Sequence, residues 1–299
     1  MAGHCSSFRR LISSGPLVTA PGVYDTLTTL LAEQAGFPAA FVSGSALGYA
    51  MLGRPDIGLL SADEIAGVVA RIRERTGLPL LVDGDTGFGN ALNVQRTIRI
   101  YERAGASGIQ IEDQTNFKAP GSLTARPVIP LGEMIGKIKA ALDARHDGDF
   151  IVSARTDAAS TLGADTAINR AVAFADAGAD MVFVESLTQR ADVERLSTTL
   201  KGRVPLLYNL LDGVNAPVQS VDDLAGLGFR MALFPAAAVQ GALAGAAAAL
   251  RAVKAAGSNA PLRSALSVTL PDAKGVNAAI GSPDFIQTAK AYDPSAFGG

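Results

Sequence analysis

Acidic residues are the ones in this sequence best placed to carry out chemistry. Asp83 and Asp85 lie two residues apart at the end of one apolar run, and Glu112 ends another. Carboxylates that face the same side repel one another unless a cation joins them. Oxygen ligands select a hard ion, which favours Mg²⁺, with Mn²⁺ as an alternative. The sequence therefore predicts a divalent-metal site that contains these three residues.

Sites built from histidine or cysteine are disfavoured by this sequence, because it contains few of these residues. It has two histidines: His4 is close to a terminus, and His146 lies in a polar run. A Ser-His-Asp triad or a His/Cys zinc site is therefore not expected. The single cysteine, Cys5, excludes an internal disulfide framework and indicates a reducing compartment.

The charge balance also argues against two classes of partner. Formal net charge is −2 and like charges do not cluster, so we expect neither nucleic acid nor a membrane as partner. The first residues lack the apolar core of a signal peptide, and every apolar stretch is shorter than the roughly 18 residues of a spanning helix. We therefore expect a soluble, cytoplasmic protein with a small-molecule substrate.

A repeated local pattern indicates the elements that position these residues. A helix-like segment ends near a glycine, and a short apolar strand follows; the glycines are Gly36, Gly105, Gly178 and, in a looser copy, Gly228. Together with four further apolar runs, this pattern gives eight strand candidates. They are 17–23, 39–44, 78–82, 108–113, 150–154, 181–186, 205–210 and 231–235.

The segments between the strands have helical periodicity. Ser61 and Glu64 form a capping box, and apolar residues then follow at helical spacing. Eight β-α alternations predict a parallel sheet closed into a (β/α)8 TIM barrel, and an open, doubly wound sheet is the alternative. We assign residues 1–254 to the barrel. Residues 255–299 are expected to form a C-terminal helical extension that packs on a neighbouring subunit.

Barrels of this type carry their chemistry at the carboxyl ends of the strands. Polar residues follow the predicted strands at this end. They are Ser43, Gly44 and Ser45, Asp83 and Asp85, Glu112 and Asp113, Arg155 and Asp157, Glu185, and Asn209. We predict that most of them converge on one rim, and we interpret Asp113 and Asp157 as caps of the helices that follow.

Three motifs in this order resemble the isocitrate lyase / phosphoenolpyruvate mutase superfamily. They are Asp83-Gly84-Asp85-Thr86-Gly87-Phe88-Gly89-Asn90, Ile111-Glu112-Asp113-Gln114 and Ser153-Ala154-Arg155-Thr156-Asp157. The resemblance implies a (β/α)8 barrel that forms a homotetramer in which neighbouring subunits exchange the last barrel helix. It also implies Mg²⁺ and an enolate-type intermediate derived from a small carboxylic acid.

The resemblance implies roles for individual residues at the metal. Asp85 would bind Mg²⁺ directly, whereas Asp83, Glu112 and Asp56 would hold its waters. The ion would stabilise negative charge on oxygen as the bond to carbon 3 breaks.

Further roles concern the substrate. Arg155 would bind the substrate's carboxylate through paired hydrogen bonds, and the backbone amides of Ser43, Gly44 and Ser45 would face the same group or a developing oxyanion. Glu185 and Asn209 match the lyase branch of the superfamily and would seat the rest of the substrate.

The sequence departs from the family in one motif. Lyases of the superfamily carry Lys-Arg-Cys-Gly-His after the second motif, and its cysteine transfers a proton. Here the run is Lys118-Ala119-Pro120-Gly121-Ser122, so Lys118 is retained as a candidate catalytic residue and the cysteine is missing. Proton transfer would then fall to Glu185, Tyr49 or a metal-bound water.

These features leave several activities open. A lyase of the methylisocitrate or dimethylmalate type and an oxaloacetate-type decarboxylase are the leading hypotheses. Both cleave a carbon–carbon bond next to a carbonyl. Cleavage of a carbon–phosphorus bond in phosphonopyruvate is an alternative, although the Lys-Thr-Asn-Ser motif of that branch is missing. A non-catalytic relic that binds metal and a 2-oxo acid is the other.

Overall fold

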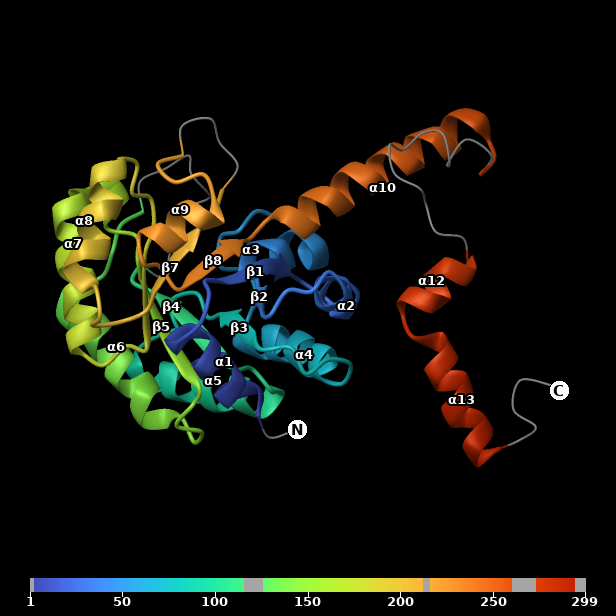
Figure 1. Cartoon of the computed structure of the whole chain (residues 1–299), viewed down its shortest axis with the longest axis horizontal. Helices are drawn as coiled ribbons and strands as arrows, with labels where there is room; N and C mark the ends of the chain where they lie inside the picture. Colours follow the sequence, from blue (N-terminus) through green and yellow to red (C-terminus); the bar gives the residue numbers. More distant parts are fainter. Residues whose placement is uncertain (1–2, 116–125, 212–215, 260–272, 294–299) are drawn as a thin grey trace. The chain divides into compact units, whose positions relative to one another are not determined.

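Eight parallel strands form a closed barrel in the computed structural model, which describes residues 3–115, 126–211, 216–259 and 273–293 (Figure 1). Each strand pairs with the next along the chain, and β8 pairs with β1. The strands are β1 (Val18–Val23), β2 (Ala40–Val42), β3 (Leu80–Asp83), β4 (Gly108–Glu112), β5 (Ile151–Thr156), β6 (Met181–Val184), β7 (Leu206–Asn209) and β8 (Met231–Phe234). The predicted (β/α)8 barrel is confirmed, and the open sheet is excluded.

Helices connect successive strands of the barrel, precede β1 and follow β8 in the chain (Figure 1). They are α1 (His4–Ser13), α2 (Thr26–Gln34), α3 (Gly44–Leu47), α4 (Ala62–Arg73), α5 (Ala91–Ala104), α6 (Leu131–Ala144), α7 (Ala159–Asp176), α8 (Arg190–Leu200), α9 (Val221–Gly226), α10 (Ala237–Ala256), α12 (Ala273–Ala279) and α13 (Ser282–Tyr292). A single π-helical turn, Gly48–Leu52, follows α3 directly.

Local sequence signals fix the ends of these helices. The Ser61 side chain accepts from the amide of Glu64, and the Glu64 carboxylate accepts from the Ser61 amide, which completes the predicted capping box at α4. The four glycines of the repeated pattern all have positive φ, between 84° and 97°. They reverse the chain from each helix into the strand that follows.

Two apolar layers separate the inside of the barrel from its outside. Leu81, Phe183 and Leu207 belong to an inner cluster, whereas the residues next to them in each strand pack against the surrounding helices. Because side chains alternate along a strand, residues two positions further on face inward at the carboxyl end. The strand alternation therefore directs polar side chains into the barrel mouth from several strands.

Helix α1 contributes to the same inner cluster. Phe8 and Ile12 are fully buried and pack with the interior side chains. The guanidinium of Arg230 donates to the carbonyl oxygens of Leu11, Ile12 and Gly15, which ties the end of α1 to the start of β8. The interior is thus filled on the side of α1 by apolar side chains, and its polar residues lie at the other end.

The chain divides after Val239 into two compact units. The first contains the barrel, and the second contains most of α10 together with α12 and α13. The boundary that we placed after residue 254 stays a prediction. Among the described residues, no helix is both long enough and apolar enough to cross a bilayer.

Gly105 offers a test of how local geometry supports the barrel. Its φ is 93°, and a Cβ there would lie 2.7 Å from Cγ of Arg73. We expect Gly105→Ala to lower the free energy of unfolding by about 3 kcal/mol, since it combines left-handed strain with an overlap. Urea denaturation followed by circular dichroism measures the change.

Gly36→Ala is the matched control. Gly36 has a φ of 84°, but a Cβ there would meet no atom within 4 Å. The cost should then be about 1 kcal/mol, from backbone strain alone. Equal losses of unfolding free energy for the two variants would show that the overlap of the new Cβ with Arg73 contributes nothing.

Candidate active site

The carboxyl ends of the strands form the candidate site, and Asp83 is central to it. This residue ends β3 and is 6% exposed. Its Oδ2 accepts from the amide of Gly44 at 3.2 Å, and its Oδ1 accepts from the amide of Asp85 at 3.2 Å. Asp83 therefore joins the end of β2 to the loop that carries Asp85.

Gly44 allows this close approach. A Cβ at this position would lie 2.9 Å from Oδ2 of Asp83. The amides of Gly44 and Ser43 are both used within the fold, because the Ser43 amide donates to the carbonyl of Val23. Of the three amides expected to face a substrate, that of Ser45 stays a candidate, and the Ser45 hydroxyl lies 3.1 Å from that of Ser43.

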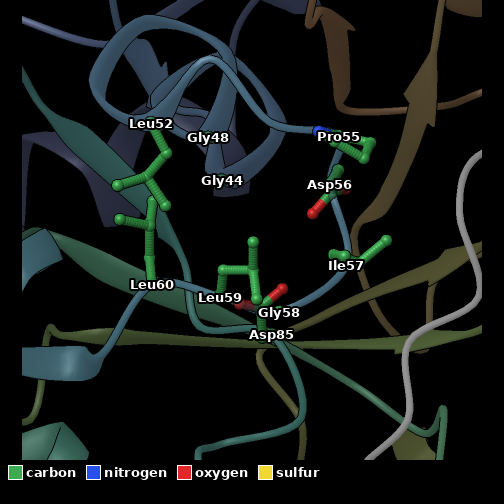
Figure 2. Close-up of a pocket in the computed structure, with 10 residues that line it drawn as sticks. All are labelled: Gly44, Gly48, Leu52, Pro55, Asp56, Ile57, Gly58, Leu59, Leu60 and Asp85. Carbon is green, nitrogen blue, oxygen red and sulfur yellow. The ribbon is translucent and has the colours of Figure 1, made fainter.

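Asp85 follows β3 in a left-handed backbone conformation, with φ of 44°. It is 8% exposed and lines one pocket together with Asp56, as Figure 2 shows. The rest of that pocket is formed by apolar residues of the 52–60 segment and by Gly44 and Gly48. Two of the four acidic residues that the family resemblance assigns to the metal, Asp56 and Asp85, therefore share a cavity.

The donor set fits Mg²⁺ held largely through water. Asp83, Asp85 and Glu112 are buried carboxylates, and carboxylate oxygen is a ligand that this hard ion prefers. Within the described residues, no three His, Cys, Asp or Glu side chains lie close enough to enclose an ion together. Mg²⁺ usually keeps several waters and takes only one or two carboxylates. One direct ligand, with the other acids on its waters, meets that requirement.

Arg155 lies in β5, and its side chain faces three acidic residues. Its Nε and Nη2 donate to the two oxygens of Asp157 at 2.9 and 2.8 Å. Oxygens of Glu112 and Glu185 each lie 3.4 Å from the guanidinium. Burial alone lowers the pKa of Arg155, but the three carboxylates outweigh it and hold this pKa well above its ordinary value.

Glu185 and Asn209 lie side by side at the ends of β6 and β7. The side-chain amide of Asn209 donates to Oε2 of Glu185 at 3.0 Å, and the amide of Ser186 donates to Oε1 at 3.0 Å. Ser186 adopts a φ of 64°, a strained conformation for this residue type. Both oxygens of Glu185 thus accept hydrogen bonds, which fix the orientation of its carboxylate.

Tyr49 and Lys118 are the other two predicted catalytic residues. Tyr49 lies in the π-helical turn and is 47% exposed. Lys118 falls outside the described residues.

The interpretation of Asp113 and Asp157 as helix caps is wrong. Helix α7 begins after Ala158 without a side-chain cap. Asp157 is fully buried and binds Arg155 and Arg126, while Asp113 accepts from Nε of Arg170 at 2.7 Å. Sequence reasoning missed these ion pairs because Arg126 and Arg170 are distant in the chain; the Arg155–Asp157 spacing of two along one strand is the only local signal.

Cys5 and the histidines are not part of the site. Cys5 is buried in α1, where its thiol donates to the carbonyl of Ala106 at 3.7 Å. Burial, followed by the charge of Asp147, raises the pKa of Cys5 to about 12. His4 contacts the hydroxyl of Ser107 beside it. The missing family cysteine is therefore not replaced by Cys5.

Comparison with known proteins identifies the family to which this chain belongs. A model of the family described as phosphoenolpyruvate phosphomutase matches residues 8–254. The chain belongs to this family. The superfamily predicted from the three motifs is thus confirmed.

Two relatives indicate the branch of the family. The chain is 39% identical over 234 residues to 2,3-dimethylmalate lyase of Eubacterium barkeri, which covers 78% of this chain and 80% of the relative. It is 40% identical over 227 residues to 2-methylisocitrate lyase of Aeropyrum pernix, which covers 76% and 72%. Both names denote carbon–carbon bond cleavage in a small carboxylic acid.

Solved structures of the phosphoenolpyruvate phosphomutase family agree with the fold. A crystal structure of 2,3-dimethylmalate lyase superposes with a TM-score of 0.91 at 29% identity and covers 100% of this chain and 98% of that one. Oxaloacetate acetylhydrolase in complex with oxalate gives 0.86 at 26% identity, with 97% and 98% covered. Phosphonopyruvate hydrolase in complex with oxalate and Mg²⁺ gives 0.84 at 30% identity, with 97% and 99% covered.

The position of Cys5 generates a prediction. Its thiol lies in α1, away from the acidic rim, and is held in the protonated form. Cys5→Ala should therefore leave kcat/KM within about twofold of the parent, since the cavity left by one sulfur affects stability and not the rim. Steady-state kinetics and a thermal melt measure the two effects separately. A loss of turnover with unchanged stability would give the thiol a chemical role after all.

Proposed function

We propose that this protein is a Mg²⁺-dependent carbon–carbon lyase that acts on a small 2-hydroxy or 2-oxo dicarboxylic or tricarboxylic acid. One observation carries the proposal: five inward-facing polar residues from consecutive strands converge at one barrel mouth. They are Asp83, Glu112, Arg155, Glu185 and Asn209. The names of the relatives support cleavage of a carbon–carbon bond. The acidic residues and the arginine of the rim support a metal ion and a carboxylate as ligands.

The metal would be held by the acidic side of this mouth. Asp85 would be the direct ligand, and Asp83, Glu112 and Asp56 would hold waters around the ion. When bound, Mg²⁺ or Mn²⁺ supplies a Lewis acid that stabilises negative charge on a substrate oxygen. Support comes from the burial of these carboxylates and from the Mg²⁺ in the phosphonopyruvate hydrolase complex.

Substrate binding would fall to side chains of β5 and β7 and to the segment that follows β2. Arg155 is the cation that would bind the substrate's carboxylate, and the amide and hydroxyl of Ser45 would assist. Oδ1 of Asn209 is buried and accepts no hydrogen bond from the described residues, so it would accept one from a substrate hydroxyl. Lys118 remains a candidate for a second contact, as the family resemblance implies.

Cleavage of a 2-hydroxy acid needs two proton transfers. A base removes the hydroxyl proton, the neighbouring carbon–carbon bond breaks, and the released carbon takes up a proton. Glu185 suits the role of base, because hydrogen bonds from Asn209 and Ser186 hold its carboxylate in place at the mouth. Tyr49 is the candidate acid, with solvent as the other source of a proton.

Decarboxylation of a 2-oxo acid is the second candidate. The run Lys118–Ser122 lacks the family's cysteine, and Cys5 does not replace it. Loss of CO₂ needs no base, and solvent can protonate the resulting carbon, so this reaction asks less of the chain. Relatives at 39–40% identity do not favour carbon–phosphorus chemistry. We place the enzyme in the cytoplasm, in keeping with its single reduced cysteine.

A substrate panel tests the proposal. The enzyme is incubated with 2,3-dimethylmalate, 2-methylisocitrate, oxaloacetate and phosphonopyruvate, with Mg²⁺ or with EDTA, and pyruvate is coupled to lactate dehydrogenase. We expect turnover of at least one of the first three acids and a loss of at least about 100-fold with EDTA, since the charge on oxygen then has no electrophile.

Chromatographic analysis of the second product separates the two candidates, because a lyase releases a carboxylic acid and a decarboxylase releases CO₂. Asp85→Ala is the companion variant and should lose activity in the presence of Mg²⁺. Metal-independent turnover would reject the mechanism, and inactivity on the whole panel would favour a relic that only binds its ligand.

We also propose that the chain assembles as a homotetramer through its C-terminal segment. Helix α10 contains no buried residue within the described chain, and Leu243 and Leu250, seven residues apart on one face, are 72% and 71% exposed. A long apolar helix of this kind usually packs against another surface. A neighbouring copy of the chain, as in the family, is the partner that we infer.

The tetramer gives a prediction for Leu250. Multi-angle light scattering of the parent should give four times the mass of one chain. Leu250→Glu should shift the distribution toward smaller species, since it would bury a charge in the interface. Leu162→Glu is the control, because Leu162 is also exposed, at 54%, but lies in α7. A monomeric parent would refute the assembly.

A further inference from the structure

Asp157 holds two arginines at the edge of the candidate site. It is fully buried directly after β5, and its Oδ1 accepts from Nη2 of Arg155 at 2.8 Å and from Nη1 of Arg126 at 2.6 Å. Its Oδ2 accepts from Nε of Arg155 at 2.9 Å. The backbone amide of Asp157 donates to Asp113, which is itself paired with Arg170. The carboxylate is thus fixed through both its backbone and its side chain.

This geometry occupies one edge of the Arg155 guanidinium. The Nε–Nη2 edge binds Asp157, so it is not available as a fork for a substrate. The ring of Phe183 lies beneath the group, 5.3 Å from Cζ. The Nη1 nitrogen makes no hydrogen bond to any residue that the structure describes. It is therefore the corner of Arg155 best able to receive an external carboxylate.

The net charge around Arg155 decides whether it can bind a substrate carboxylate. A buried Asp157 paired with Arg155 alone would form a neutral unit, and a substrate carboxylate would gain little from it. With Arg126 added, Arg155, Arg126 and Asp157 together carry a net charge of +1, and Glu112 and Glu185 are the other carboxylates that face Arg155. Arg126 and Arg155 donate to the same oxygen of Asp157, so Arg126 changes the charge of the unit through this shared carboxylate.

Arg126 is itself held by the backbone around it. Its carbonyl accepts from the hydroxyl of Thr161 at 3.3 Å, and the next residue, Pro127, accepts from the amide of Thr115 at 2.9 Å. Gln114 and Val128 form an antiparallel bridge beside this bond. The side chain of Arg126 is only 16% exposed. The ion pair is therefore part of the folded framework and does not depend on a ligand for its position.

We propose that Asp157 and Arg126 are positioning residues for Arg155: Asp157 fixes the guanidinium by its Nε–Nη2 edge, and Arg126 offsets the charge of Asp157 so that Nη1 can bind the substrate's carboxylate. This inference rests on the proposed function in so far as Arg155 binds a carboxylate. It goes beyond that function because neither residue touches the substrate.

The experiment measures a ligand as well as turnover. Oxalate binding in the presence of Mg²⁺ is followed by isothermal titration calorimetry, and kcat and KM are measured on whichever acid the parent cleaves. The variants are Arg126→Gln, Arg126→Lys, Asp157→Asn and the double variant Arg126→Gln/Asp157→Asn. Arg203→Gln is the matched control, because Arg203 forms an ion pair with Asp176 on an exposed surface.

We expect Arg126→Gln to raise the Kd for oxalate, and KM, by about tenfold with kcat changed less, the scale of one charge-assisted contact. Arg126→Lys keeps the charge and should restore binding to within about threefold of the parent. Because the proposal has Arg126 affect Arg155 through Asp157, the Gln change should have little further effect on oxalate binding in the Asp157→Asn background. Arg203→Gln should match the parent.

Three results would overturn the inference. They are parent-like oxalate binding by Arg126→Gln, additive effects in the double variant, and a parent that does not bind oxalate at all. A circular dichroism melt of each variant separates these effects from misfolding; if Asp157→Asn does not fold, the Gln and Lys variants of Arg126 decide alone. A parent that binds oxalate but cleaves no acid on the panel would reject the proposed function and leave the binding test intact.

Discussion

The structure depends on the repulsion among acidic side chains that it brings to one end of the barrel. Asp83, Asp85 and Glu112 are nearly inaccessible to water, where unbalanced negative charge is costly. The chain answers locally: amides of Gly44 and Asp85 point at Asp83, and Gln114 donates to Glu112 at 2.8 Å. These dipoles orient the acids, and the guanidinium of Arg155 lies 3.4 Å from Glu112. Buried carboxylates grouped at one end of the barrel are the physical reason for proposing metal binding here.

The barrel makes this concentration of charge tolerable through alternation along its strands. Leu81 and Asp83 lie two apart on β3, and Phe183 and Glu185 are related in the same way at β6. The first of each pair fills the interior with α1, and the second faces the mouth. A slip of one residue in register would exchange core and site together. The same two-residue alternation of side chains along the strands therefore sets both the apolar interior and the polar rim.

Much of this arrangement could be predicted from the sequence, because its determinants are local. Glycines at helix ends and short apolar runs identify the eight strands, and strand ends identify Asp83, Glu112 and Asn209 as rim residues. The ion pairs of Asp113 and Asp157 could not be found in this way, since their partners are 57 and 31 residues away. An aspartate before a helix has the same local pattern whether it caps that helix or binds a distant arginine, and only tertiary structure separates the two.

The same limit applies to the proton chemistry, which separates the two candidate reactions. Binding a carboxylate and stabilising charge on oxygen are common to both, and the rim provides for them with charges of fixed position. Cleavage of a hydroxy acid additionally needs a base, and the carboxylate of Glu185 is held in position by hydrogen bonds from Asn209 and Ser186. In a decarboxylase such a carboxylate would lie close to the departing CO₂ with no proton to accept. A carboxylate fixed at the mouth therefore favours the lyase over the decarboxylase, even though the family's cysteine is missing.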